Sequence, residues 1–359
     1  MRYKQDWENT QNKFMEFWAR ENHDRPLINI SAPKENKPFK AAPSKNHSER
    51  WLDTEYVIAR ERANMENTFY GLEAYPMVFP NLGPDFFGAT FGADIIFEET
   101  TSYSVPFIQT PEEFAKLEFK TDNKWWQKMV EMTEAFVKDA GGDYFVGITD
   151  LHPGADGLVS LRGPEHLCMD LYDHPEAFKK GLFKILPALQ YQLDALYEIT
   201  QNNLKGSTNW MGIWHPEKWY VTSSDFICMI SEDMFEEFII PELVTEIDWL
   251  AQRSIFHLDG PGALKHLDRL LEIPNLAGVQ WVYGAGQPSA AHWMPTLKKI
   301  QDAGKCIVIE AYAEDVVPLS KELKPEGVYY HISHNSVKNE EDAKAFIKLI
   351  ENSYKKTLF

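Results

Sequence analysis

Ile255-Phe256-His257-Leu258-Asp259-Gly260 is one of four short apolar stretches in the second half of the chain that end in groups able to bind a metal or transfer a proton. The other three are Val279-Gln280-Trp281-Val282-Tyr283-Gly284, Cys306-Ile307-Val308-Ile309-Glu310 and Val328-Tyr329-Tyr330-His331-Ile332-Ser333-His334. Strands that alternate with helices favour a parallel sheet, and a barrel of such strands gathers their C-terminal ends on one face. The four stretches therefore predict an α/β enzyme whose site lies where the strands end.

Four more candidate strands bring the total to about eight, the number that a closed (β/α)8 barrel requires. They cover residues 76–80, 144–149, 208–214 and 225–230. We expect one (β/α)8 TIM barrel domain over residues 1–359, with residues 1–70 as an N-terminal helical extension packed on the barrel. An open doubly wound sheet is the alternative, but no Gly-x-Gly-x-x-Gly follows a strand to mark a dinucleotide site.

Composition excludes some classes of partner. The formal net charge of −18 over 359 residues argues against nucleic acid or an anionic membrane surface, because both need a basic footprint. A highly anionic substrate would need a local cluster of arginines, and the only close pair in sequence is Arg60 and Arg62. The three scattered cysteines favour a reducing compartment, and no apolar run is long enough to span a membrane, so we expect a cytoplasmic protein.

His257 and Asp259 are the first candidate metal ligands, because side chains two apart on an extended strand share one face. A histidine and a carboxylate together suit zinc, although an ion pair or a helix cap is the alternative. Glu310 is a further candidate, since a carboxylate after three apolar residues needs a partner, which could also be a lysine. His331 and His334 are an odd number of positions apart, so only one of them can face the interior.

Asp150 and His152 have the same two-residue spacing at an earlier strand end, and Asp156 follows closely. They could orient a substrate or transfer protons, and Asp225 is a further candidate for proton transfer. The alternative is that the aspartates only stabilise a loop before Gly154, through Asx turns in which their side chains hydrogen-bond to nearby backbone groups.

Aromatic side chains are dense between residues 209 and 220, just past a candidate strand. A wall of this kind can grip a flat ring or a sugar, although tryptophans are also common in protein cores. The residues that we expect to contact a substrate are Asn209, Trp210, Trp214, Trp219, Trp281 and Tyr283.

The chain resembles the uroporphyrinogen decarboxylase superfamily, which includes the decarboxylases of haem synthesis and the zinc-dependent corrinoid methyltransferases. The resemblance spans nearly the whole chain. It is carried by Phe17-Trp18, Asp24-Arg25-Pro26, Phe91-Gly92-Ala93-Asp94, Leu161-Arg162-Gly163-Pro164-Glu165, Ser223-Ser224-Asp225, Ser231-Glu232-Asp233-Met234-Phe235-Glu236-Glu237-Phe238, His257-Leu258-Asp259-Gly260 and Ser333-His334-Asn335.

The resemblance implies a (β/α)8 barrel with its site at the strand C-termini. The decarboxylases carry extra arginines shortly after the Arg-Pro step, whereas Leu27-Ile28-Asn29-Ile30 follows here, which argues against a porphyrinogen substrate. The methyltransferases bind zinc through a His-x-Cys pair and a cysteine on the last strand. In this chain His257 keeps its place, Asp259 replaces the first cysteine and His334 falls at the last-strand position.

These replacements predict a harder Lewis acid than sulfur-rich zinc, suited to polarising an ether oxygen. We therefore expect methyl transfer from a small methoxy substrate to cobalamin carried by a partner corrinoid protein, with His257, Asp259, Glu310 and His334 as zinc ligands. A decarboxylase or other lyase acting on a non-porphyrin substrate, with Asp150, Asp225 and His334 handling protons, is the alternative. A binding protein that has lost catalysis is a third.

Overall fold

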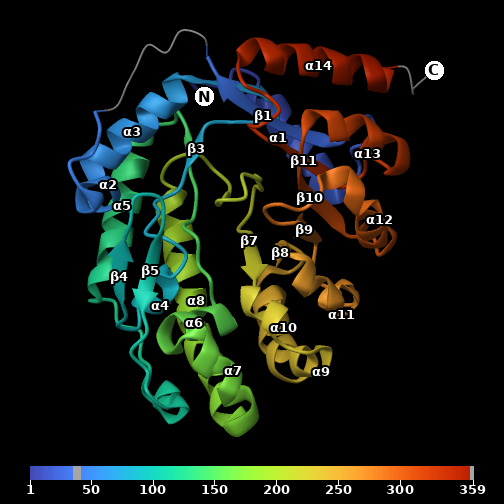
Figure 1. Ribbon diagram of the computed structural model, residues 1–359. Helices are drawn as coiled ribbons and strands as arrows, with labels where there is room; N and C mark the ends of the chain where they lie inside the picture. The colour runs from blue at the N-terminus through green and yellow to red at the C-terminus, as the bar shows by residue number, and fades with distance from the viewer. Residues whose placement is uncertain (35–41, 356–359) are drawn as a thin grey trace.

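The computed structural model describes residues 1–34 and 42–355 and has a parallel sheet at its centre, with helices on the outside (Figure 1). The strands are β1 (Leu27–Pro33), β2 (Thr68–Leu72), β3 (Met77–Val78), β4 (Asp94–Phe97), β5 (Ser102–Val105), β6 (Phe145–Val146), β7 (Tyr220–Ser223), β8 (Ser254–Asp259), β9 (Gly278–Val282), β10 (Cys306–Ala311) and β11 (Val328–Ile332).

The main sheet has seven strands in the order β2-β1-β11-β10-β9-β8-β7. All neighbours in it are parallel except β1 and β2. A separate parallel pair joins β3 to β6, and a single parallel bridge joins Ile148 to Asn209. The expectation of an α/β protein with a central parallel sheet is confirmed, but no continuous hydrogen-bonded ladder closes the sheet into a barrel within the described residues.

Helices surround the strands on both sides of the view in Figure 1, with α14 lying across β1 and β2. They are α1 (Trp7–Ala19), α2 (His47–Leu52), α3 (Thr54–Glu66), α4 (Phe86–Ala89), α5 (Lys124–Ala140), α6 (Gly154–Arg162), α7 (Pro164–Asp173), α8 (Pro175–Thr200), α9 (Glu232–Met234), α10 (Ile240–Leu250), α11 (Leu267–Leu271), α12 (Met294–Asp302), α13 (Val316–Glu322) and α14 (Glu340–Lys355). Shorter helical turns are η1 (Pro111–Lys116), η2 (Asp225–Met229), η3 (Phe235–Ile239), η4 (Pro261–His266), η5 (Ala290–Trp293) and η6 (Ala313–Asp315).

Two of the expected strands are wrong. Residues 225–230 are not a strand: residues 225–229 form the helical turn η2, and the strand that precedes them is β7. Residues 208–214 make only one isolated bridge, from Asn209 to Ile148, and a second bridge joins the flanking residues Ser207 and His215. The stretch expected as an N-terminal helical extension holds α1, α2 and α3, but it also holds β1, which pairs with β11 inside the main sheet. Residues 35–41 of that stretch lie outside the described part.

Strand β10 is apolar on both faces over most of its length, as in a sheet that is covered on both sides. In β10, Ile307, Val308 and Ile309 are all buried. A second group of buried side chains includes Phe14 and Phe17 of α1 together with Trp219 and Tyr329. The helix α1 is therefore part of the folded core.

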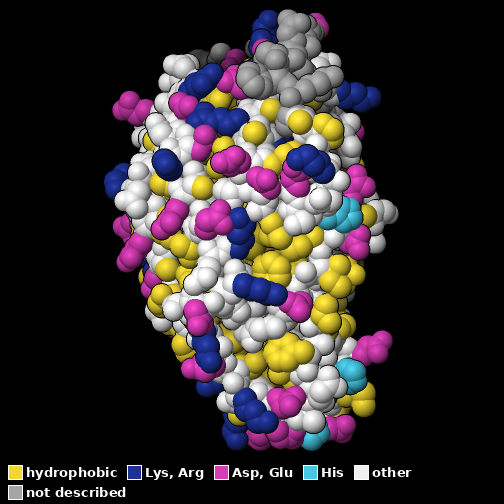
Figure 2. Space-filling model, turned by 90° about the vertical axis from the view of Figure 1, so that its left-hand side faces the viewer, with side chains coloured by type: hydrophobic (Ala, Val, Ile, Leu, Met, Phe, Trp, Pro, Cys, Tyr) yellow, Lys and Arg dark blue, Asp and Glu magenta, His cyan; other side chains and the backbone are white. Residues whose placement is uncertain are grey.

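The outer surface shows mixed charge. Figure 2 shows acidic and basic side chains interspersed over one face of the molecule. None of the helices in residues 1–34 and 42–355 combines the length and the apolar character needed to cross a bilayer.

Candidate functional site

The segments that follow β6 and β7, together with the C-terminal end of β8, bring acidic and imidazole side chains together. Their potential ligand atoms form two groups, each with all atoms within 4.8 Å of one another. One group holds His152, Asp156 and Asp225, and the other holds Asp225, His257 and Asp259. Asp225 belongs to both, so the two groups form one continuous polar site.

The second group depends on the alternation of β8. Phe256 and Leu258 are fully buried, whereas His257 and Asp259 are partly exposed on the other face. Nδ1 of His257 lies 2.6 Å from Oε1 of Gln280 on β9. Because an amide oxygen can only accept, Nδ1 is the donor and Nε2 carries the free lone pair. Nε2 lies 3.9 Å from Oδ1 of Asp225, so the lone pair is on the side of the carboxylates.

These residues fit a divalent metal. A metal-binding histidine usually donates its other ring N–H to a second acceptor, as His257 does here. Burial and the charge of Asp225 raise the pKa of Asp259, and a cation between the two carboxylates would relieve that repulsion. One imidazole and two carboxylates leave a fourth position open in a tetrahedral zinc site, as in catalytic zinc sites.

The first group is organised around a charged histidine. Nε2 of His152 lies 3.2 Å from Oδ2 of Asp150. Burial alone would lower the pKa of His152, but the hydrogen bond and charge of Asp150, with the charges of Asp156 and Asp225, raise that pKa to about 9. His152 is therefore an imidazolium at neutral pH in the metal-free protein and can donate a proton; a metal would bind it only by displacing that proton.

Asp156 joins the two groups structurally. Its Oδ2 accepts a hydrogen bond from the backbone N–H of Asp225 at 2.8 Å, and its Oδ1 accepts one from Phe226 at 2.9 Å. The carboxylate thus caps the start of η2 and fixes the position of Asp225. Burial raises the pKa of Asp156 to about 6, against the charge of His152 and these two hydrogen bonds, which lower it.

Two further acids lie buried behind this site on α10. Glu242 and Glu246 are each 3% exposed, and Oε1 of each has no hydrogen-bond partner among the described residues. Burial, aided by the charge of Asp156, raises the pKa of Glu242 to about 8, and burial raises that of Glu246 well above its usual value. The Glu242 side chain is therefore largely protonated at neutral pH.

A cavity of about 630 Å³ opens beside His257, at the ends of β9, β10 and β11. Its lining includes Trp210, Trp281, Tyr283, Glu310 and His331. Gln280, the partner of His257, also lines it. The ring of Trp210 meets the His257 imidazole edge-on, with centroids 5.3 Å apart. The cavity therefore borders the candidate metal ligands.

The indole groups in this cavity have unused donors. The Nε1 atoms of Trp210 and Trp281 are buried and have no hydrogen-bond partner among the described residues. A buried N–H without a partner is costly, so a ligand atom that accepts from it would be stabilised. Trp210, Trp281 and Tyr283 all line the cavity, but Trp281 is fully buried, packs against Trp293 and lies on the opposite face of β9 from Gln280.

Three expected substrate contacts are wrong. Trp214 and Trp219 are buried in the core beside α1 and do not line the cavity. Nε1 of Trp219 donates to the carbonyl oxygens of Ser207 and Ile213. Asn209 is also fully buried, and its Oδ1 accepts from the backbone N–H of Met211 at 3.0 Å. Trp214 and Trp219 are therefore core residues that pack around a loop.

The expected four-ligand set is not assembled. Glu310 and His334 belong to neither group of potential ligands, and both are exposed. Glu310 points along the cavity beside His331, its register partner on β11. His331 is thus the histidine of this pair that lines the cavity, and the Asn29 amide donates to its Nε2 at 3.0 Å. Burial lowers the pKa of His331 to about 4, so it is neutral at neutral pH.

One residue of this site, Gln280, was not predicted from the sequence. Gln280 is polar within an otherwise apolar strand, and that contrast was the available signal. Asp156 was noted near Asp150 and His152, but its link to Asp225 depends on how α6 meets η2. His331 was considered only as an alternative to His334.

Comparison with known proteins supports the fold. No protein-family model matches the chain, and no curated protein matches it in sequence. Among solved structures, the chain is similar to a methyltransferase from Methanosarcina mazei, with a TM-score of 0.65 and 13% sequence identity. The alignment covers 96% of this chain and 99% of that chain. The two proteins share an overall fold over essentially their whole length.

Proposed function

We propose that this chain is a metal-dependent methyltransferase built on a (β/α)8 barrel of the uroporphyrinogen decarboxylase type. It would move a methyl group from a small methylated substrate, with a methoxy compound as the expected donor, to the cobalamin of a partner corrinoid protein. The observation that carries the proposal is the His257–Gln280 hydrogen bond, which leaves Nε2 facing the carboxylate of Asp225. The similarity of fold to a methyltransferase adds support.

Asp225, His257 and Asp259 would hold the metal. Compared with the sequence expectation, Asp225 takes the place of Glu310 and His334, which belong to neither ligand group. When bound there, zinc would supply a Lewis acid that polarises the oxygen carrying the methyl group. Asp156 would keep Asp225 in position through the two backbone N–H groups that it accepts from.

The aromatic cavity would hold the substrate. Trp210 would offer its indole N–H to an oxygen atom of the substrate, and Tyr283 would add an aromatic wall. His331 is neutral, and none of the described residues that line this cavity is a lysine or an arginine, so a neutral substrate is favoured over an anionic one. This agrees with the methoxy expectation.

Methyl transfer to free reduced cobalamin tests the proposal. The purified protein, loaded with zinc, would be incubated with cob(I)alamin and either 2-methoxyphenol or methanol, and formation of methylcobalamin would be followed by absorbance. The expected result is zinc-dependent methylation that Asp259→Asn abolishes and that Glu236→Gln, a distant surface control, leaves intact. Equal methylation by the zinc-free protein and by Asp259→Asn would refute metal dependence.

A lyase on the same fold is the second candidate, and the geometry around His152 favours it. An imidazolium 3.2 Å from Asp150 and close to Asp225 could protonate a carbanion formed by loss of CO2. Such an enzyme would release CO2 without cobalamin or metal, and His152→Gln would abolish the release. Activity that survives a metal chelator and needs His152 would favour the lyase over the methyltransferase.

A further inference from the structure

The close arginine pair of the sequence separates in the structure. Arg62 binds Asp139 at 2.8 Å and Asp143 at 2.7 Å, so its charge is used to join α3 to the end of α5. Arg60 turns away from it and donates from Nη1 to the carbonyl oxygen of Arg50 at 3.1 Å. The arginine cluster of this chain is therefore Arg50 and Arg60, from α2 and α3.

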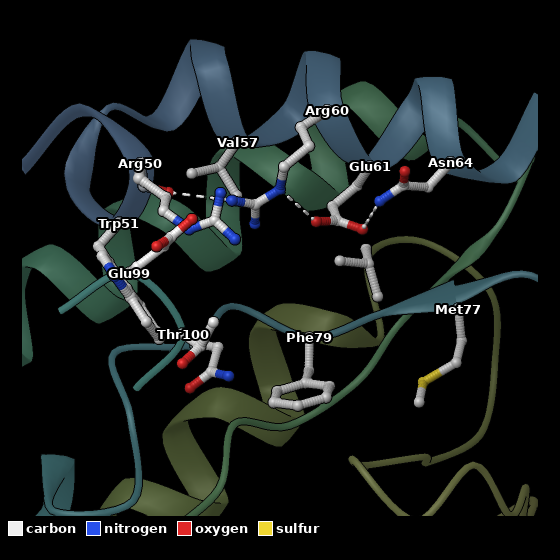
Figure 3. A pocket seen from close by; sticks show the side chains of 12 residues that line it. Arg50, Trp51, Val57, Arg60, Glu61, Asn64, Met77, Phe79, Glu99 and Thr100 are labelled. Carbon is white, nitrogen blue, oxygen red and sulfur yellow. Dashed lines mark hydrogen bonds and ion pairs between the residues drawn. The ribbon is translucent and has the colours of Figure 1, made fainter. Parts of the chain in front are cut away.

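Both arginines line a cavity of about 560 Å³ that is separate from the aromatic cavity. Figure 3 shows their guanidinium groups entering it side by side, with Trp51 and Phe79 forming apolar walls. Met77 of β3 adds a further apolar surface. The cavity has the size of a small-molecule site, with a charged end and an apolar end.

The charges in this cavity are incompletely paired. Arg60 donates from Nε to Glu61 at 2.8 Å, and Asn64 donates to the other oxygen of the same carboxylate. The guanidinium of Arg50 makes no hydrogen bond or ion pair with residues 1–34 or 42–355. Glu99 points toward it in Figure 3, but that carboxylate is exposed and within the described residues no ion pair joins it to either arginine.

A guanidinium cannot lose its proton, so two of them at one end of a cavity favour a negatively charged ligand. We propose that this cavity binds a small organic oxyanion, whose carboxylate or phosphate contacts Arg50 and Arg60 and whose apolar or aromatic body lies against Trp51 and Phe79. Arginine matches the geometry of both oxyanions through paired N–H donors. The site would be independent of the metal group, because none of Asp225, His257 and Asp259 lines it.

Isothermal titration calorimetry on the full chain at constant ionic strength tests this proposal. The probes are benzoate and phenyl phosphate, with inorganic phosphate as an oxyanion without a ring and benzyl alcohol as a ring without charge. We expect one or both ring-bearing oxyanions to bind more tightly than inorganic phosphate, and benzyl alcohol to give no signal at the same concentration. Preference for benzoate would assign a carboxylate ligand, and preference for phenyl phosphate a phosphate ligand.

Three variants test whether the oxyanion binds in this cavity. Arg50→Gln should weaken it by about tenfold or more, as for loss of a charged hydrogen bond, and should leave the melting temperature unchanged because the Arg50 guanidinium has no partner to lose. Glu99→Gln should tighten binding by removing a competing negative charge. Arg269→Gln is the matched control, because Arg269 is one-third exposed, pairs with Glu236 and does not line the cavity. Equal affinities in all three variants, or no binding of either ring-bearing oxyanion, would overturn the proposal.

Discussion

His257 donates from Nδ1 to Oε1 of Gln280 across the β8–β9 pair, at a distance of 2.6 Å. The two residues are register partners, so the strand pairing itself sets the orientation of the imidazole. The contact leaves Nε2 free on the side of Asp225 and Asp259. A supporting residue of this kind orients a metal ligand before the metal binds.

Replacing Gln280 should weaken metal binding. Gln280→Leu removes the acceptor for Nδ1, so the imidazole can rotate and change tautomer, and we expect a 10- to 100-fold loss of zinc affinity, about the effect known for such supporting residues. Competition with a chromogenic chelator measures the affinity. Gln287→Leu is the control, because Gln287 lines the same cavity but is exposed on a loop. The same loss in both variants would show that the effect is not specific to the His257 contact.

The His152 imidazole should titrate far above its usual range. Burial lowers the pKa of His152, but Asp150 and the neighbouring carboxylates raise it to about 9. Since the folded-state pKa is raised, the charged histidine stabilises the fold fully below about pH 6.5 and loses that effect as the pH rises through about 9.

Histidine-resolved NMR titration of wild type and Asp150→Asn measures this pKa directly. We expect a value near 9 in wild type and a clear decrease in the variant, while Asp173→Asn at the end of α7 has no effect. If the pKa of His152 is unchanged in Asp150→Asn, Asp150 does not stabilise the protonated form of His152.

Neutralising Glu242 should stabilise the protein in alkaline solution. Burial raises the pKa of Glu242 to about 8, so folding favours its protonated form; this stability is fully present below the unfolded value of about 4.5 and is lost as the pH rises through about 8. Between about pH 6 and about pH 8.5 the loss is roughly 2 to 3 kcal/mol.

Glu242→Gln should remove that part of the pH dependence, as measured by urea unfolding at the two pH values. Glu198→Gln, an exposed position on α8, is the control. If wild type and Glu242→Gln lose equal stability over this interval, Glu242 is not protonated in the folded protein.

Replacing Trp219 and Trp281 by phenylalanine should lower the free energy of unfolding by different amounts. Trp219→Phe leaves the carbonyl oxygens of Ser207 and Ile213 without this donor, and we expect a loss of about 1 to 3 kcal/mol in the free energy of unfolding. Trp281→Phe removes a donor that has no partner among the described residues, so its loss should be smaller. Chemical denaturation of both variants measures the difference. A larger loss in Trp281→Phe would contradict the difference in hydrogen bonding between the two indole groups.

The part of the site that could be predicted from sequence follows from the two-residue period of strands. That period correctly placed His257 with Asp259, and the same spacing placed Asp150 with His152. The spacing of apolar residues alone does not distinguish a short strand from a helical turn. It therefore predicts a strand at residues 225–230, whereas residues 225–229 form η2.

Other features depend on tertiary packing. Trp214 and Trp219 lie in an aromatic-rich segment just past a candidate strand, and only the position of α1 makes them core residues. Asp225 could be proposed for proton transfer, but its closeness to His257 depends on Asp156, which reaches η2 from another helix. His334 was favoured over His331 by the resemblance, whereas the turn after β11 places His334 in solvent.

Metal content is the most direct test of the central claim that Asp225, His257 and Asp259 hold a cation. Elemental analysis after zinc loading and gel filtration would compare wild type with Asp259→Asn, His257→Gln, Glu310→Gln and His334→Gln. We predict about one zinc per chain in wild type and in the last two variants, and almost none in the first two. Zinc that persists in Asp259→Asn and His257→Gln, or that disappears in Glu310→Gln or His334→Gln, would contradict this account.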